Sequence, residues 1–153
     1  MPQFIETIDI GRPPQEVWRL IGTPERWFDG YLETQSRSDN YPAPDTSDDH
    51  VYRTKKKEQV HTHVTRSEAP TLLEEDEEGQ TFSRHVRFCL TPSLVGSEVV
   101  GTALRVEDDV NFKGLGKLAA PIASRDIKQR WHSSLENLKA AAEGEPAQAA
   151  RGM

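Results

Sequence analysis

The chain of 153 residues has a single cysteine, Cys89, and no long apolar run. One cysteine excludes an internal disulfide and is typical of a reducing compartment, so we expect a cytoplasmic protein. No stretch approaches the roughly 20 apolar residues that cross a bilayer, so the sequence predicts no membrane span. Residues 1–10 lack a basic stretch and contain Glu6 and Asp9, which argues against a signal peptide.

Positive charge is also scarce. Lysine and arginine number 19 against 25 aspartate and glutamate residues, which gives a net charge of −6. Because nucleic-acid binding needs a basic face, we expect no nucleic-acid partner. The short basic run Lys55–Lys57 and the acidic run Glu74–Glu78 are interpreted as solvated tips of β-hairpins. The length fits one domain, which needs neither a disulfide nor a metal to stay folded.

The first thirty residues predict a strand followed by two short helices. Residues 4–10 alternate apolar and polar side chains, as a half-buried strand does. Pro13 and Pro14 then suit the first turn of a helix, where their missing N–H groups cost nothing. Thr23 and Pro24 begin a second short helix in the same way.

Antiparallel strands and one long helix account for most of the remaining chain. Alternation and turn residues predict strands over 31–38, 50–55, 58–67, 71–75, 81–90 and 97–107, with a polar loop over 39–49 and a turn over 92–96. From about residue 115 the apolar spacing becomes helical, and Pro121 is expected to kink or restart that helix. Its buried face is predicted to carry Ile127, Trp131, Leu135 and Leu138. Residues 144–153 are rich in Ala, Gly, Glu and Pro and predict a disordered tail.

Several segments, in this order and spacing, resemble one superfamily. They are IDIGRPPQEVW at 8–18, TPERW at 23–27, SEAPTLL at 67–73, FCLTP at 88–92, GSEV at 96–99, and the C-terminal helix. Together they identify residues 1–143 as similar to the START/SRPBCC superfamily, most closely its polyketide cyclase/dehydrase-like branch.

The resemblance implies an α+β helix-grip fold, in which a curved antiparallel sheet of about six or seven strands wraps around the long C-terminal helix. It also implies an internal cavity for an apolar or polyketide- or lipid-like small molecule, without a cofactor. Some relatives cyclise or dehydrate polyketides, which makes a cyclase or dehydratase one hypothesis. Others carry or sequester a ligand, or activate chaperones, so a non-enzymatic carrier, resistance protein or interaction module is the alternative.

Arg84 is the first candidate catalytic residue. Alternation along 81–90 places it on the same face as Phe82, Val86 and Phe88, which we expect to line the cavity. An unpaired guanidinium is too costly to bury. Arg84 should therefore lie at the cavity mouth, pair with a carboxylate, or contact a polar group of the ligand; the alternative is that it reaches water at a strand end.

Tyr31 is the second candidate catalytic residue, as a proton or hydrogen-bond donor at the cavity rim. Trp27 beside it could stack on a flat ligand, although both side chains could equally close the core. Thr54 and Thr62 are weaker candidates for ligand contact. Trp131 on the long helix is expected to face either the cavity or the sheet.

Three histidines invite a metal site, but the expected strand faces argue against one. His61 and His63 lie two residues apart on one strand, and His85 and Cys89 share a face of another. Because Val60, Thr62 and Val64 alternate with the first two histidines and look inward, those histidines should lie on the outer face, so we predict no metal site. The segment Gly114–Gly116 is interpreted as a hinge, or as a gate to the cavity.

Overall fold

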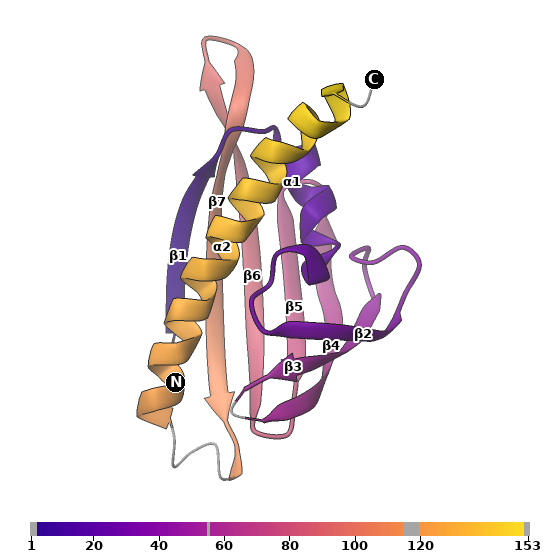
Figure 1. Cartoon of the computed structure of the whole chain (residues 1–153), viewed down its shortest axis with the longest axis vertical. Helices are drawn as coiled ribbons and strands as arrows, with labels where there is room; N and C mark the ends of the chain where they lie inside the picture. The colour runs from indigo at the N-terminus through magenta and orange to yellow at the C-terminus, as the bar shows by residue number, and fades with distance from the viewer. Residues whose placement is uncertain (1–2, 55, 115–119, 152–153) are drawn as a thin grey trace.

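The computed structural model describes residues 3–54, 56–114 and 120–151. Seven antiparallel strands form one sheet in the order β1-β7-β6-β5-β4-β3-β2, and the helices lie on one side of it (Figure 1). The strands are β1 (Gln3–Ile10), β2 (Tyr31–Arg37), β3 (Ser47–Arg53), β4 (Lys57–Glu68), β5 (Leu72–Glu78), β6 (Phe82–Val95) and β7 (Glu98–Phe112). The predicted α+β helix-grip architecture is confirmed.

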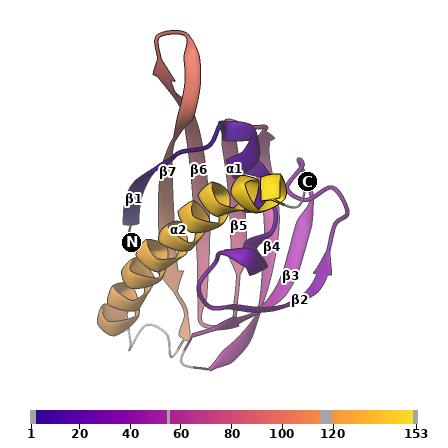
Figure 2. The same cartoon turned by 45° about the horizontal axis from the view of Figure 1, so that its top comes forward.

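The long helix α2 (Ala120–Arg151) crosses the sheet diagonally. In Figures 1 and 2 it runs over the face of β1, β7 and β6, while β2 and β3 lie to one side of it. Trp131, Leu135 and Leu138 are buried against the sheet, as their helical spacing predicts, and Ala142 extends the same face. Burying this apolar face is what fixes the helix on the sheet.

The two predicted short helices are present after β1. The first, α1 (Pro14–Ile21), has a proline in its first turn and buries Val17, Leu20 and Ile21. The second is a single 3₁₀ turn, η1 (Pro24–Arg26). Trp27 follows it and donates its indole N–H to the carbonyl oxygen of Leu20 at 2.7 Å, which ties the end of η1 to α1.

Several strands are longer than the sequence predicts, because each gains backbone partners that local propensity does not reveal. β3 begins at Ser47, inside the expected polar loop, and pairs with β4 from Ser47 to Arg53. β6 continues through Pro92 to Val95, so the expected turn over 92–96 is reduced to the residues around Gly96, whose φ of 63° suits glycine.

The interpretation of Glu74–Glu78 as a solvated hairpin tip is wrong. These residues form most of β5 and pair with both β4 and β6. Alternation along β5 points Glu75 and Glu77 into the molecule, where they are 5% and 6% exposed. The hairpin turn lies after them, at Gly79 and Gln80.

The C-terminal helix begins at Ala120, so Pro121 stands in its first turn, where proline is tolerated. Residues 115–119, where the helical spacing begins in the sequence, lie outside the described residues. The helix is assigned to Arg151, past the domain boundary predicted at residue 143.

Candidate functional site: a small cavity with one aromatic and one acidic wall

A small cavity lies between the segment that follows α1 and the inner face of the sheet. Its volume, counted as the space open to the centre of a water molecule, is about 20 Å³. It is lined by Ile21, Pro24, Trp27, Phe28, Tyr31, Tyr41, Asp48, His50, Thr62, Glu75, Glu77, Phe88 and Trp131. These residues come from segments far apart in the sequence, so the cavity exists only in the folded chain.

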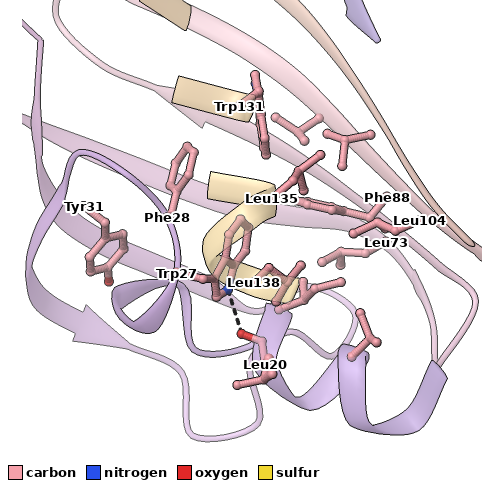
Figure 3. Close-up of a cluster of buried hydrophobic side chains, with 14 of the residues drawn as sticks. Leu20, Trp27, Phe28, Tyr31, Leu73, Phe88, Leu104, Trp131, Leu135 and Leu138 are labelled. Carbon is pink, nitrogen blue, oxygen red and sulfur yellow. Dashed lines mark hydrogen bonds between the residues drawn. The ribbon is translucent and has the colours of Figure 1, made fainter. Parts of the chain in front are cut away.

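One wall of the cavity is aromatic. Phe28 packs against Trp27 with ring centroids 5.5 Å apart and against Trp131 at 5.1 Å. Phe88 of β6 meets the edges of both tryptophans, at 6.2 and 6.0 Å. Figure 3 shows this group gathered between the chain after η1, α2 and the sheet. Such edge-to-face and tilted contacts are the favoured aromatic geometries.

A second part of the lining, which we call the acidic wall, consists of acidic side chains. Asp48 on β3 and Glu75 and Glu77 on β5 point inward and line the cavity, together with Thr62 on β4. Each of these four side chains is at most 6% exposed. Because burying a carboxylate without a partner is very costly, the arrangement depends on the groups that surround it.

Asp48 is held by Tyr31 and Arg37. The Tyr31 hydroxyl donates to its carboxylate at 3.0 Å, and Arg37 Nε donates at 3.0 Å. Burial opposes ionisation of Asp48, but His50 and Arg37 outweigh it and lower the pKa of Asp48 below its ordinary value. Burial and the nearby charge of Asp48 raise the pKa of Tyr31 to about 12, so Tyr31 is a neutral hydrogen-bond donor.

The hydrogen-bond partner of Glu75 is the phenol group of Tyr41, whereas Asp48 also binds a cation, Arg37. Its carboxyl group is hydrogen-bonded to the hydroxyl of Tyr41, and burial together with the charge of Glu77 raises its pKa to about 8. Glu75 is therefore mostly protonated at neutral pH. Carboxyl groups that carry a proton at neutral pH can serve as general acids.

Arg84 lies behind the cavity wall. Its guanidinium donates to Glu77 at 2.9 Å and stands 3.7 Å from Asp108. Four aromatic rings surround it, with centroids between 5.1 and 5.8 Å from Cζ: Phe28, Tyr52, Phe82 and Trp131. The sequence left several positions possible for Arg84, and the structure has the one in which it pairs with carboxylates. Aromatic rings enclose that pair.

Asp108 completes this buried network from β7. It is fully buried and accepts a hydrogen bond from the Trp131 indole N–H at 2.7 Å. Burial raises the pKa of Asp108 to about 6, although the charge of Arg84 lowers it. The pair Asp108–Trp131 therefore orients the tryptophan that lines the cavity.

His50 is buried in the cavity wall with an unsatisfied ring. It is 3% exposed, and neither ring nitrogen has a hydrogen-bond partner among the described residues. Its ring stacks on Tyr31 at 4.2 Å, and Nδ1 stands 3.5 Å from the Asp48 carboxylate. An unsatisfied polar group in the interior is costly and usually has a function or a partner.

The structure brings five of the nine predicted site residues to the cavity: Trp27, Tyr31, Thr62, Phe88 and Trp131. Phe82 and Val86 point inward as predicted but belong to the core beside Arg84. Thr54 is not among the lining residues; it lies in the β3–β4 turn and donates to the Glu58 carboxylate at 3.0 Å.

Sequence reasoning missed Asp48, His50, Glu75, Glu77 and Asp108. The alternation of β5 already placed both glutamates in phase with Leu73, and that of β7 placed Asp108 in phase with Leu104 and Val106. Charge was read as a sign of solvent exposure, which hid this signal.

His61, His63 and His85 lie on the outer face of the sheet, as expected for His61 and His63. Each is close to a carboxylate: His61 to Asp49 at 2.6 Å, His63 to Asp45 at 3.7 Å and His85 to Asp76 at 2.6 Å. Of the expected hinge or gate, Gly114 adopts a positive φ of 52°, and residues 115 and 116 lie outside the described residues.

None of the helices in the described ranges has the length and apolar content that crossing a bilayer requires.

No curated protein sequence matches the chain. Solved structures match it closely in fold. A protein from Thermus thermophilus is 16% identical with a TM-score of 0.71, over 94% of this chain and 99% of that one.

Two further matches have informative descriptions. A START superfamily protein from Mycobacterium smegmatis is 16% identical with a TM-score of 0.66, over 96% of this chain and 98% of that one. DynU16, a protein of the dynemicin biosynthetic locus, is 16% identical with a TM-score of 0.62, over 92% of this chain and 47% of its own. The sequence model of one family matches residues 1–143. The chain therefore belongs to the family described as polyketide cyclase/dehydrase and lipid transport.

Proposed function

We propose that this protein binds a mostly apolar small molecule with one polar end in the cavity described above. The observation that carries the proposal is that the lining combines aromatic side chains with the hydrogen-bonding side chains of the acidic wall. Small-molecule sites combine apolar and aromatic surface with a few polar groups that orient the ligand. Membership of the family supports the same conclusion.

A ligand of that kind requires the cavity to widen. About 20 Å³ of accessible space holds one or two water molecules. We propose that the chain from Pro24 to Tyr31 moves, which would require breaking the two hydrogen bonds that join it to α2. The Asp29 amide donates to Ser134 Oγ at 2.8 Å, and Asn137 Nδ2 donates to the carbonyl oxygen of Trp27 at 3.3 Å. Ligand binding would select the conformation in which this segment lies farther from the sheet.

The cavity also suits proton transfer, so we extend the proposal to a cyclisation or dehydration of the ligand. Glu75, protonated at neutral pH, would protonate the ligand oxygen that leaves as water or becomes a hydroxyl group, and an unpaired ring nitrogen of His50 would take the proton from the neighbouring carbon. Tyr31 would exchange its hydrogen bond to Asp48 for one to a ligand oxygen. Arg84 would act as a positioning residue through Glu77 and not by touching the ligand. Holding the ligand in a reactive geometry would supply much of the rate enhancement.

Native mass spectrometry of the purified protein, followed by thermal-shift screening against polyketides, sterols and fatty acids, tests the binding proposal. A ligand that binds the folded state raises Tm in a concentration-dependent manner. Thr62→Phe, which fills the cavity, should abolish the shift relative to its own unliganded Tm, and Thr54→Ala, outside the cavity, should retain it. Equal shifts in both variants would place the ligand elsewhere.

A second function is favoured by the hairpin of β6 and β7, which projects from the body of the molecule (Figures 1 and 2). Its tip carries Leu94, Val95, Val99 and Val100, which are 44% to 66% exposed. Pairing with β5 ends at Cys89 and pairing with β1 ends at Thr102, so in the described residues both edges of the tip lack a neighbouring strand. Exposed apolar surface with open strand edges is typical of a protein-interaction site.

We propose a second copy of the chain as the partner of this hairpin. Between residues 88 and 104 the only charged side chain is Glu98. Two tips can therefore meet with little local charge repulsion, although each copy carries a net charge of −6. A twofold arrangement would pair like edges of the two hairpins. Sedimentation at increasing concentration should show a dimer that Val99→Lys abolishes, with Ser97→Lys as control; a wild-type monomer throughout contradicts this proposal.

A further inference from the structure

The buried groups around the cavity contain more acids than bases. Asp48, Glu75, Glu77 and Asp108 are each at most 6% exposed, and the guanidiniums paired with them belong to Arg37 and Arg84. Four carboxyl groups therefore face two permanent cations. None of the described residues that line the cavity is a lysine or an arginine.

His50 gives a second, independent indication of a missing partner. Its side chain is almost completely buried and lines the cavity, yet neither ring nitrogen is hydrogen-bonded to any residue that the structure describes. A proton on Nδ1 would face the Asp48 carboxylate at 3.5 Å, which leaves the lone pair of Nε2 as an acceptor. The Nε2 atom of His50 is thus an acceptor that no donor among the described residues reaches.

The aromatic wall is compatible with the same kind of group. Phe28 and Trp131, which line the cavity, also pack within 5.8 Å of the Arg84 guanidinium. Their neighbours Trp27 and Phe88 line the cavity as well. The faces of such rings attract cations, and tryptophan does so most strongly.

We propose that the polar end of the ligand is a protonated amine, bound between the carboxyl groups of Asp48, Glu75 and Glu77, the His50 ring and the aromatic wall. This inference rests on the proposed binding function and names its ligand class. An ammonium group supplies up to three N–H donors and one positive charge, which complement these acceptors. A carboxylate or phosphate would instead meet the ionised Asp48 and Glu77 and is disfavoured by like-charge repulsion.

Binding of a cation should displace the proton of Glu75, so this inference rests on the binding function and not on the role of Glu75 as a proton donor. Without ligand, burial and Glu77 keep that carboxyl group protonated at neutral pH. An ammonium group beside it favours the ionised form, so binding near pH 7 should release a proton, and the affinity should rise with pH toward 8. The charged or titratable groups around Glu75 are Tyr41 on the β2–β3 loop, Asp48 and His50 on β3, Glu77 on β5 and Arg84 on β6.

The test compares three probes of nearly equal shape: benzylammonium, benzyl alcohol and benzoate. Isothermal titration calorimetry at pH 7 and low salt measures each affinity, and buffers of different ionisation enthalpy measure the proton release. We expect benzylammonium to bind at least tenfold more tightly than benzyl alcohol, with release of up to one proton, and benzoate not to bind.

Glu75→Gln provides the variant, since it removes one acid and keeps the shape of the side chain. It should weaken benzylammonium binding at least tenfold, change benzyl alcohol binding less than twofold, and abolish the proton release. Glu74→Gln is the matched control, because it makes the same charge change on the outer face of β5, where Glu74 pairs with His85. It should leave all three values unchanged.

The outcomes separate this inference from the function on which it rests. Tighter binding of benzyl alcohol or benzoate than of benzylammonium would retain an apolar ligand site and overturn the amine. Equal effects of Glu74→Gln and Glu75→Gln would also overturn it, because they would indicate a general charge effect. Binding of none of the three probes would overturn both proposals.

Discussion

The inner face of the sheet has two regions that follow the same alternation and differ in content. On β6 and β7, the inward positions Phe88, Leu90, Leu104 and Val106 are apolar and pack under α2. On β3 and β5, beside the strands that α2 crosses, the inward positions include Asp48, His50, Glu75 and Glu77. We refer to these as the apolar region and the acidic region.

The difference shows that an inward position in a sheet does not have to be apolar. In the apolar region, removal of side-chain surface from water stabilises the fold directly. In the acidic region, carboxyl groups remain inside because guanidinium, phenol and indole groups bind them. Arg84 and Asp108 lie at the boundary, one on β6 and one on β7. The two regions should therefore respond differently to substitution and to pH.

The largest expected loss of stability comes from a substitution at the boundary between the two regions. Arg84→Met removes the cation and leaves Glu77 and Asp108 buried without it, which should cost about 3–5 kcal/mol of the free energy of unfolding. Urea denaturation measures the loss. Arg87→Met, on the exposed face of the same strand, is the control. A loss below about 1 kcal/mol for Arg84→Met would mean that the pairing does not hold the acidic region together.

Truncation of a side chain in the apolar region should also reduce the free energy of unfolding, for another reason. Leu138 on α2 is 0% exposed, so Leu138→Ala leaves a cavity and should cost about 2–5 kcal/mol. Unlike effects in the acidic region, this loss should not change with pH. Glu136→Ala on the exposed side of the helix should remain within about 0.5 kcal/mol of wild type. A loss for Leu138→Ala that changes with pH would contradict the predicted difference between the apolar and acidic regions.

The pH dependence of stability isolates the acidic region. The pKa of Glu75 is raised from 4.5 to about 8 in the folded state, so the folded protein binds its proton more tightly than the unfolded chain. This contribution is complete below pH 4.5 and is lost as the pH rises through about 8.

Wild type should therefore lose stability relative to Glu75→Gln across that window, by at most about 1.4 kcal/mol for each pH unit. Chemical denaturation at several pH values measures the difference. Glu74→Gln should parallel wild type. A constant difference between wild type and Glu75→Gln would show that Glu75 is ionised throughout.

The smallest effect is expected outside both regions, at the projecting hairpin. Val95 is 66% exposed, so Val95→Ser should change the free energy of unfolding of the monomer by less than about 0.5 kcal/mol. Denaturation at low protein concentration measures it. A larger loss would show that the tip packs against something in solution, which would favour the dimer.

Much of the architecture could be predicted from the sequence, because it depends on periodicity. The helical spacing of Trp131, Leu135 and Leu138 and the alternation of Phe82, Arg84 and Val86 both gave the correct buried faces. The failures have a common cause. The lengths of β3 and β5 and the burial of Glu75 depend on partners that are distant in the sequence.

What the sequence by itself determined is therefore which side of each element is buried, since that follows from the period of two or 3.6 residues. Only the tertiary structure decided what each inward side chain meets. Glu75 and Glu77 are the same residue type on the same strand, yet one is hydrogen-bonded to Tyr41 and stays protonated while the other pairs with Arg84. Burial removes water and makes the nearest neighbour decisive, and neighbours are set by how the chain packs.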